Sequence, residues 1–304
     1  MKNTRTKLLP LLYCLLFVVR MNGQVTISLR KSFVDSINNR ATVSTNYKIL
    51  FAHDRPNRIA VDGDLHASGY DNIVGLASVI EIMNAAGQST ACGHIQQAVN
   101  STETISITGA WRLWFEHPQH VDQTQGTIVP IEDTNPAHVF EIHPITNIQG
   151  IDISSSLVPI KNDKTEYAYK TAENAFSSYD KKSCKISAEG DMVLVQSSQI
   201  GDNYVKFKIS LLETPLEAED GFIVHCKVLG DNDTEVEASV RMIFIKNSAP
   251  ANSVKLLGAG DKMEVLGIPR VCLNEVVNRL ALSATNPDIL NAFLPYEMII
   301  VAQF

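Results

Sequence analysis

The feature that most constrains the fold of this chain is a run of strict alternation between residues 105 and 116. Apolar side chains occupy every second position, and mostly polar ones lie between them. A helix repeats every 3.6 residues and cannot place such a pattern on one face, whereas a strand repeats every two. The run therefore predicts a half-buried strand. The apolar positions are Ile105, Ile107, Gly109, Trp111, Leu113 and Phe115, and the intervening ones are Ser106, Thr108, Ala110, Arg112, Trp114 and Glu116.

Four further strands and one helix are predicted around this run. Pro144, inside the last strand, is expected to end regular pairing or mark an edge. The order strand, strand, strand, helix, strand, strand is that of an oligonucleotide/oligosaccharide-binding (OB) barrel, which we predict for residues 41–150. The strands are expected at Ala41–Phe51, Val61–His66, Leu76–Met83 and His138–Ile148, and the helix at Thr90–Val99 after Ser89.

The second half is predicted to be an α+β domain of antiparallel hairpins, residues 165–304, after a polar linker at 151–164. We expect one hairpin to join Met192–Gln196 to Tyr204–Leu212 and another to join Phe222–Leu229 to Glu235–Ile245. Helices are expected at Thr171–Tyr179 and Leu273–Leu282, and a buried strand ends the chain at Phe304. The predicted fold class is thus mostly β and α+β, and no internal repeat is evident.

The N-terminus has the pattern of a secretory signal peptide, predicted for residues 1–23 and followed by an extension at 24–40. Basic residues precede the apolar run Leu8–Val19, which is shorter than a membrane-spanning helix requires. A buried or anchoring N-terminal helix is the alternative. The segment carries four of the 26 basic residues, so its removal leaves 22 against 33 acidic ones, a net charge of −11. We therefore expect a periplasmic or secreted protein, without a transmembrane helix, that does not bind nucleic acid.

Four cysteines follow the predicted signal peptide: Cys92, Cys184, Cys226 and Cys272. An oxidising compartment would permit a disulfide between two of the last three, and their spacing does not select which. The absence of a CxxC pair excludes a zinc ribbon or a thioredoxin motif.

Two short motifs resemble those of a group of uncharacterised exported bacterial proteins. The motifs are Asp62-Gly63-Asp64-Leu65-His66 and Phe140-Glu141-Ile142-His143-Pro144-Ile145. That group carries a DGD-x-H strand and a later E-[LI]-H-P-[VI] strand. The resemblance covers about residues 41–150, and it implies an OB-like domain type without an assigned activity.

The Asp62–Asp64 triplet also resembles a strand of the staphylococcal-type nucleases, which are OB barrels that use calcium. The resemblance implies that Asp64 would be a metal ligand. The rest of that family's pattern is missing, because Leu65 replaces a threonine and Glu81 is the one charged residue in the following strand. Calcium requires six to eight oxygen ligands, so a single matching residue does not make a site.

Histidines are concentrated in the first half, where seven of the eight lie between His53 and His143. The period of a strand places Asp64 and His66 on one face, and Glu141 and His143 likewise. Imidazole and carboxylate groups on neighbouring strands could bind zinc with a position left for water. The alternative is a scatter of locally hydrogen-bonded histidines. The candidate metal ligands are Asp62, Asp64, His66, Glu141 and His143.

The strand of strict alternation also supplies candidate ligand-binding residues: Arg112, Trp114, Glu116 and His117. Trp114 lies on the polar face beside Arg112, where an exposed indole could stack on a sugar or a base. A second cluster of side chains could equally cover it. Glu116 and His117 end the strand at a rim, where Pro118 could also impose a simple polar turn.

Two functions follow from these features. The first is an exported module that binds an extracytoplasmic ligand, either a glycan or an envelope protein. The second is a metal-dependent hydrolase, acting for instance on phosphodiesters, in which zinc or calcium would be held by Asp64, His66, Glu141 and His143. Three of those side chains would have to converge within about 5 Å. The sequence alone identifies no catalytic residue and does not decide whether the protein is an enzyme.

Overall fold

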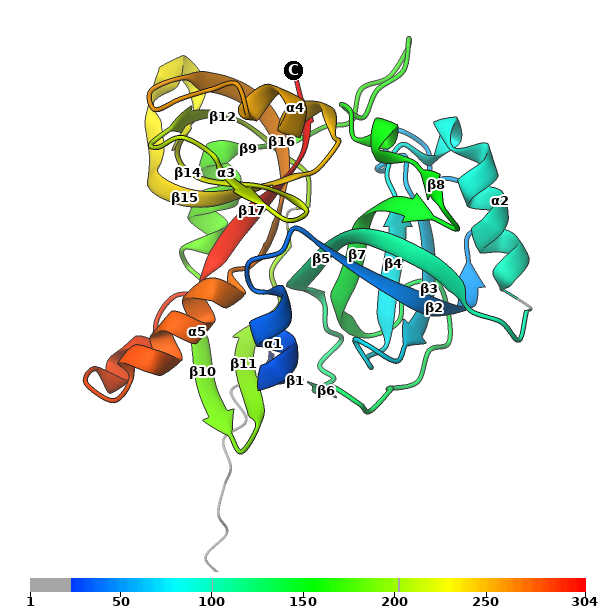
Figure 1. Cartoon of the computed structure of the whole chain (residues 1–304), viewed down its shortest axis with the longest axis horizontal. Helices are drawn as coiled ribbons and strands as arrows, with labels where there is room; N and C mark the ends of the chain where they lie inside the picture. Colours follow the sequence, from blue (N-terminus) through cyan, green and yellow to red (C-terminus); the bar gives the residue numbers. More distant parts are fainter. Residues whose placement is uncertain (1–22, 100, 202) are drawn as a thin grey trace, which may run out of the picture.

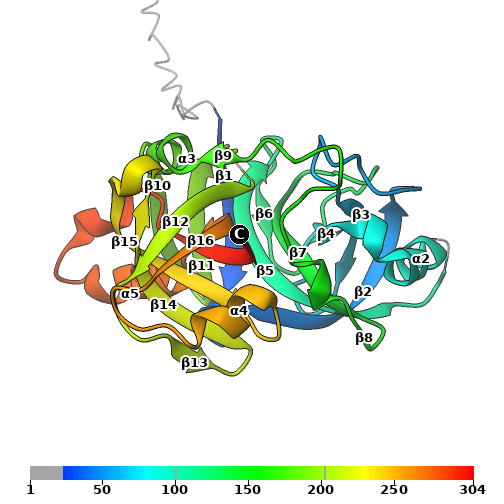
Figure 2. The same cartoon turned by 90° about the horizontal axis from the view of Figure 1, so that it is seen from above.

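The computed structural model describes residues 23–99, 101–201 and 203–304, and most of its regular structure is β-strand. Two barrels lie side by side, and a smaller sheet lies at one end of them (Figures 1 and 2). The predicted signal peptide falls almost entirely outside the described residues. No helix in the described part of the chain is long and apolar enough to cross a membrane.

The first barrel confirms the prediction of an OB-like domain. Its five strands pair in the order β4-β3-β2-β5-β7, and a parallel pairing of β4 with β7 closes the sheet. Helix α2 (Ser89–Ala98) connects the third strand to the fourth, and Phe115 and Phe140 are fully buried. Closure removes the unpaired edges that five short strands would expose. The strands are β2 (Thr42–Ala52), β3 (Leu65–Asp71), β4 (Ser78–Ile82), β5 (Ile105–His117) and β7 (His138–Ile148).

The second half contains another closed barrel of the same connectivity. Its strands pair in the order β14-β15-β17-β16-β12, and β12 also pairs with β14. As in the first barrel, the third and fifth strands are parallel and a helix, α4 (Ala249–Val254), follows the third strand. The predicted hairpin of Phe222–Leu229 with Glu235–Ile245 is thus part of a barrel. The strands are β12 (Val205–Leu211), β14 (Gly221–Leu229), β15 (Glu235–Ile245), β16 (Lys262–Val271) and β17 (Tyr296–Gln303).

The two barrels also share their register. When Glu141 of β7 is matched to Glu297 of β17, all five strand pairings of the first barrel have a counterpart in the second. The matched pairs are Tyr47–Asp71 with Ile209–Val228, Ala67–Ile80 with Val224–Met242, Ile80–Ile142 with Met242–Met298, Arg112–Glu141 with Arg270–Glu297, and Val43–Gly109 with Val205–Gly267. The two barrels therefore form an internal structural repeat.

A third sheet joins segments that are distant in the sequence. Strand β1, within the predicted N-terminal extension, lies between β11 and the two-residue β6. The predicted hairpin of β11 with β12 is wrong, because the turn at Gly190 pairs β11 with β10 and leaves β12 to the second barrel. The members are β1 (Gln24–Arg30), β6 (Gln123–Thr124), β10 (Cys184–Glu189) and β11 (Met192–Ser198).

Short elements complete the chain. Within the predicted linker, residues 151–164, Leu157 and Ile160 are fully buried, so this segment is a packed connection. All four cysteines among the described residues are buried and unpaired. The remaining elements are α1 (Lys31–Ile37), η1 (Ala85–Gly87), β8 (Ile151–Asp152), η2 (Ser154–Ser156), β9 (Lys170–Thr171), α3 (Ala172–Tyr179), β13 (Leu216–Ala218), η3 (Asp231–Asp233), α5 (Leu273–Leu282) and η4 (Pro287–Asn291).

Candidate functional site

The predicted metal ligands meet in one buried cluster of polar side chains on the first barrel, which we call the polar cluster. Strands β3, β4, β5 and β7 supply most of it, because their alternation places these residues on a common face. Glu81 and Tyr204 belong to the cluster but were not among the predicted ligands. The members are Asp62, Asp64, His66, Glu81, Arg112, His138, Glu141, His143 and Tyr204.

Asp64 and His143 form the centre of the polar cluster. The Nε2 atom of His143 lies 3.5 Å from Oδ2 of Asp64 and 2.8 Å from the hydroxyl of Tyr204. Tyr204 in turn donates to Asp64 at 2.5 Å, and the backbone N–H of Asn84 donates to the other carboxylate oxygen. Burial raises the pKa of Asp64 above the usual range of a carboxyl group.

Glu81 links the two histidines of the cluster. Its Oε2 atom lies 3.4 Å from Nδ1 of His143 and 3.4 Å from Nε2 of His66. Burial raises the pKa of Glu81. Burial alone would lower the pKa of both histidines, but the surrounding carboxylates, Glu81 foremost, raise it to about 10 for His143 and about 9 for His66. One charged residue in an otherwise apolar strand was the signal that could have identified Glu81.

Arg112 and Glu141 form the best-paired part of the cluster. Arg112 donates to Glu141 at 2.6 Å and to Glu116 at 2.7 Å, while His138 lies 3.0 Å from the other oxygen of Glu141. Burial alone would raise the pKa of Glu141, but Arg112 and the neighbouring histidines hold it well below its usual range. Glu141 is therefore a carboxylate, and it contacts Nδ1 of His143 at 3.7 Å.

The polar cluster is enclosed by the contact between the two barrels. Asp64, Arg112 and His143 are fully buried. Tyr204, which covers Asp64 and His143, packs with Leu157, Ile160 and residues of the second barrel in one apolar group. A substrate the size of a sugar or a nucleotide has no room to reach these side chains, so the arrangement does not provide an open catalytic centre.

Two arginines join the barrels in a reciprocal way. Arg112 of the first barrel donates to the carbonyl oxygen of Pro269 at 3.0 Å, and Arg270 of the second donates to that of Trp111 at 3.0 Å. Each carbonyl belongs to the residue that precedes the other arginine. Because Arg112–Glu141 and Arg270–Glu297 also occupy matched positions, the contact between β5 and β16 is approximately two-fold symmetric.

The predicted ligand-binding residues of β5 are mostly covered. Trp114 is fully buried, with its ring edge-on to Tyr179 and its Nε1 atom 3.5 Å from the carbonyl oxygen of Gly201. Of the two interpretations of Trp114, the structure therefore shows the covered one. Arg112 belongs to the contact between the barrels, and only His117 is substantially exposed, with Glu116 partly so.

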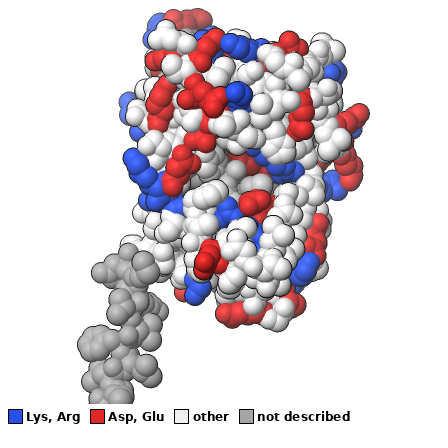
Figure 3. Space-filling model, turned by 90° about the vertical axis from the view of Figure 1, so that its left-hand side faces the viewer, with Lys and Arg blue, Asp and Glu red and all other residues white. Residues whose placement is uncertain are grey.

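The larger of two pockets described on the second barrel is a groove that sequence reasoning missed. Its volume is about 770 Å³, and it lies between strands β14 and β15 on one side and helix α5 on the other. On the face shown in Figure 3, acidic and basic side chains are interspersed and do not form a single basic patch. The groove is lined by Asp180, His225, Glu237, Ser239, Val240, Arg241, Cys272, Asn274, Glu275, Asn278, Arg279, Phe293, Pro295 and Tyr296.

Paired acids and an exposed aromatic ring characterise this groove. The carboxyl groups of Asp180 and Glu237 share a hydrogen bond, and Tyr296 donates to Asp180 at 3.2 Å. Burial and the hydrogen bond to Asp180 raise the pKa of Glu237 to about 7. Phe293 is 56% exposed and stacks with the guanidinium of Arg279. No local pattern predicts this groove, because its walls come from three separated segments.

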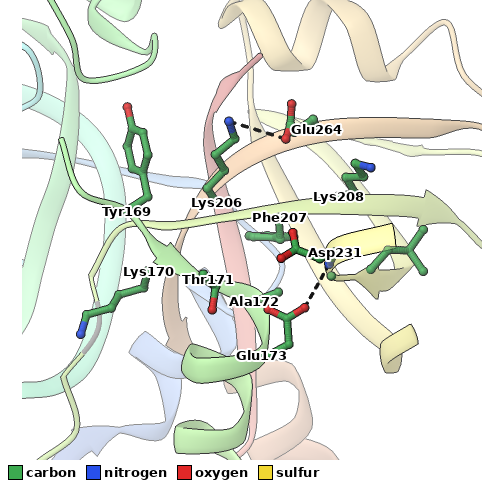
Figure 4. Close-up of a pocket in the computed structure, with 12 residues that line it drawn as sticks. Tyr169, Lys170, Thr171, Ala172, Glu173, Lys206, Phe207, Lys208, Asp231 and Glu264 are labelled. Carbon is green, nitrogen blue, oxygen red and sulfur yellow. Dashed lines mark hydrogen bonds and ion pairs between the residues drawn. The ribbon is translucent and has the colours of Figure 1, made fainter. Parts of the chain in front are cut away.

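A smaller pocket of about 330 Å³ lies between β12 and the start of α3 (Figure 4). Most of its charged side chains already have partners: Lys206 lies 3.6 Å from Glu264, Lys208 lies 3.1 Å from Asp233, and Glu173 accepts from the backbone N–H of Asp231. The pocket therefore lacks a set of polar groups that converge on empty space.

Comparisons with known proteins leave the family of the chain open. No family model matches it, and no curated protein matches it. Among solved structures, the single-stranded DNA binding protein from Thermus aquaticus is similar over 75% of this chain and 83% of that chain, with 10% identity and a TM-score of 0.17. Similarity with so low a TM-score supports neither a fold nor a function. The assignment of two OB-like barrels rests on the strand pairings.

Proposed function

We propose that this protein is an exported glycan-binding module that holds its ligand in the groove of the second barrel. The observation that carries the proposal is the position of the groove. OB folds bind oligonucleotides and oligosaccharides on the face of their second and third strands and on two adjoining loops. In the second barrel these strands are β14 and β15, and the loop between the fourth and fifth strands contains α5. The groove of about 770 Å³ lies at that place.

The chemistry of the groove favours a neutral sugar over a nucleic acid. Carboxyl groups and the amides of Asn274 and Asn278 can bond to sugar hydroxyls, which both donate and accept. The exposed ring of Phe293 offers an apolar face for a pyranose. The groove is lined by three carboxyl groups and two arginines, and both arginines, Arg241 and Arg279, are already paired with glutamates. Nonspecific nucleic-acid affinity requires groups that are free to neutralise phosphates.

The hydrolase alternative receives less support from the geometry. Asp64 and His143 are near each other, as a metal centre requires, but Tyr204 and the second barrel enclose them. Hydrolysis needs a substrate next to the metal-bound water. Export to the periplasm or the medium is part of the proposal and rests on the N-terminal sequence pattern.

Titration of the purified protein with defined oligosaccharides tests the proposed groove. We compare the unaltered protein with Phe293→Ala, which removes the aromatic face. Leu256→Ala is the control, since Leu256 is also an exposed apolar residue and does not line the groove. Calorimetry should show that Phe293→Ala weakens glycan binding about tenfold, or about 1.4 kcal/mol, while Leu256→Ala leaves it unchanged.

Equal loss in both variants, or no affinity for any glycan, would contradict the proposal. Single-stranded DNA serves as the comparison ligand in the same titration. Binding to DNA that weakens steeply with salt would assign the groove to nucleic acid instead.

A further inference from the structure

We propose that Asp64, Glu81 and His143 bind a divalent transition-metal ion, zinc by the chemistry of the donors, and that this ion secures the contact between the barrels. The proposal concerns the polar cluster and is independent of the glycan groove. Two carboxylates and one imidazole are a donor set that zinc accepts. Calcium fits poorly, because it prefers six to eight oxygen ligands and an imidazole stands at the centre of this set.

The spacing of the donors suits one ion. One ligand atom from each of the three residues lies within 4.8 Å of the others. Ligands of tetrahedral zinc, at bond lengths of about 2.0–2.2 Å, lie about 3.3–3.6 Å apart. His143 lies 3.4 Å from Glu81 through Nδ1, but 3.5 Å from Asp64 through the other nitrogen, Nε2. An ion bound by Nδ1 would thus find Glu81 at ligand spacing, and a rotation of the Asp64 side chain toward Nδ1 would complete the site.

A buried nitrogen atom that has carboxylates nearby but makes no hydrogen bond provides a second, independent observation. His143 is fully buried, yet its Nδ1 atom makes no hydrogen bond to any described residue. The atom faces Glu81, but the geometry is not that of a hydrogen bond. A buried polar atom without a partner is costly, and native proteins rarely leave one. A metal ion beside Nδ1 would satisfy it.

The groups around the three residues are arranged as a supporting shell. Metal-binding residues are usually held by outer partners that fix their orientation. Here Tyr204 donates to Asp64 and lies 2.8 Å from Nε2 of His143, and Asn84 donates to Asp64 through its backbone. Arg112 fixes the carboxylate of Glu141 against the same imidazole.

The carboxyl groups of the polar cluster outnumber its one permanent cation, Arg112, so a metal ion would take the place of a proton on His143. Four carboxyl groups, those of Asp62, Asp64, Glu81 and Glu141, meet one guanidinium and the histidines. Buried charge is tolerated when it is paired or when it coordinates a metal. Because Tyr204 immediately precedes the first strand of the second barrel, an ion held at Asp64 would strengthen the link between the two halves.

Refolding with defined metals tests the site. The purified protein is unfolded with a chelator present, refolded with zinc, manganese or no metal, and passed through gel filtration. We expect about one zinc ion per chain by elemental analysis, and a higher Tm in the zinc sample than in the metal-free one, since a ligand of the native state stabilises it.

Two variants identify the ligands. Glu81→Gln keeps the shape of the side chain and removes its charge, and it should weaken zinc binding by at least the 10–100-fold that loss of an outer partner costs. The matched control is Asp71→Asn, because Asp71 is a buried carboxylate of the same barrel whose partners are Thr45 and two backbone N–H groups. The control should retain zinc.

The proposal would be overturned by an unaltered protein that retains no metal and has the same Tm with and without zinc. Equal zinc content in Glu81→Gln and Asp71→Asn would overturn the ligand assignment. If Glu81→Gln fails to fold, the metal content and the Tm of the unaltered protein decide the question. A failure of the metal-site proposal would not affect the glycan titrations, because no residue of the polar cluster lines the groove.

Discussion

The two barrels share connectivity and register, yet they differ at matched positions on one face. His66 and Glu81 of the first barrel correspond to Ile223 and Ile243 of the second, which are paired in the same way. His143 lies one residue after the matched pair Ile142 and Met298, so it corresponds to Ile299. Both faces are largely buried. The difference shows that one backbone scaffold accepts either a polar network or an apolar layer at the same place.

This difference indicates that the polar cluster is not needed to form a barrel. Replacing buried ion pairs by apolar residues of similar volume is often neutral or stabilising. The second barrel already carries such an apolar layer. The proposed metal ion would give the polar network a role that an isoleucine layer cannot fill.

The arginines that join the barrels give the largest expected effect. Arg112→Met and Arg270→Met should each lower the free energy of unfolding by about 3–5 kcal/mol, because each removes a fully buried guanidinium from a buried glutamate. Glu141 then keeps its hydrogen bond with His138, and Glu297 keeps Arg241. Arg270→Met should cost more, since Arg270 also donates to three carbonyl groups, one in β5 and two just before β2, whereas Arg112 donates to one carbonyl group of the second barrel. Shifts of the denaturant midpoint measure both effects.

The matched control is Lys227→Met, which breaks the exposed pair of Lys227 with Glu235 and should cost less than about 1 kcal/mol. If Arg270→Met were as mild as this control, the reciprocal contact would not hold the barrels together. A clearly larger cost for Arg112→Met would reverse the order that the hydrogen bonds predict.

The matched glycines of the fourth strands should respond unequally. A Cβ atom on Gly109 would lie 2.6 Å from the carbonyl oxygen of Pro144 and 2.8 Å from Cα of Ile145, which are backbone atoms. On Gly267 it would meet only side-chain atoms, the nearest being the ring of Phe207 at 3.0 Å. Gly109→Ala should therefore cost about 3 kcal/mol, and Gly267→Ala about 1 kcal/mol or less.

Thermal unfolding of the two glycine variants measures this difference. Each variant is the control for the other, because both positions share a register. Equal losses of Tm would show that the fourth strands of the two barrels pack alike, and this would contradict the prediction.

The smallest effect concerns the groove, which belongs to the second barrel. The pKa of Glu237, raised to about 7, exceeds its value in an unfolded chain, so the folded protein binds this proton more tightly. The associated stability is present below pH 4.5 and is lost as pH rises towards 7. The Tm of Glu237→Gln should therefore rise relative to that of the unaltered protein between pH 4.5 and 8, by about 1–2 °C, since solvent screens this partly exposed group.

Calorimetry at several pH values checks the sign of this shift. Glu213→Gln is the comparison, because hydrogen bonds to His225 lower the pKa of Glu213. The Tm of Glu213→Gln should therefore fall relative to that of the unaltered protein as pH rises from the folded to the unfolded pKa of Glu213. A Tm difference for Glu237→Gln that does not change with pH would contradict the shared proton between Asp180 and Glu237.

Side-chain alternation identified most strands and their faces. The alternation in residues 105–116 predicted β5, and His138–Ile148 was predicted with the bounds that the structure shows. The same period placed Glu141 and His143 together, as the polar cluster confirms. Glu81 was missed because its partners lie on other strands, and a strand pattern does not reveal which neighbour it will pair with.

The sequence by itself determined where strands and helices form and which side chains share a face, because these patterns are local and repeat every two or 3.6 residues. Only the tertiary structure decided that β1 pairs with β11, that the hairpins of the second half close into a barrel, and that Tyr204 covers Asp64. Such contacts join residues far apart in the chain, so they depend on which surfaces remain to be buried once the local elements exist. The groove between β15 and α5 arises in the same way, from the packing of elements that each carry only part of it.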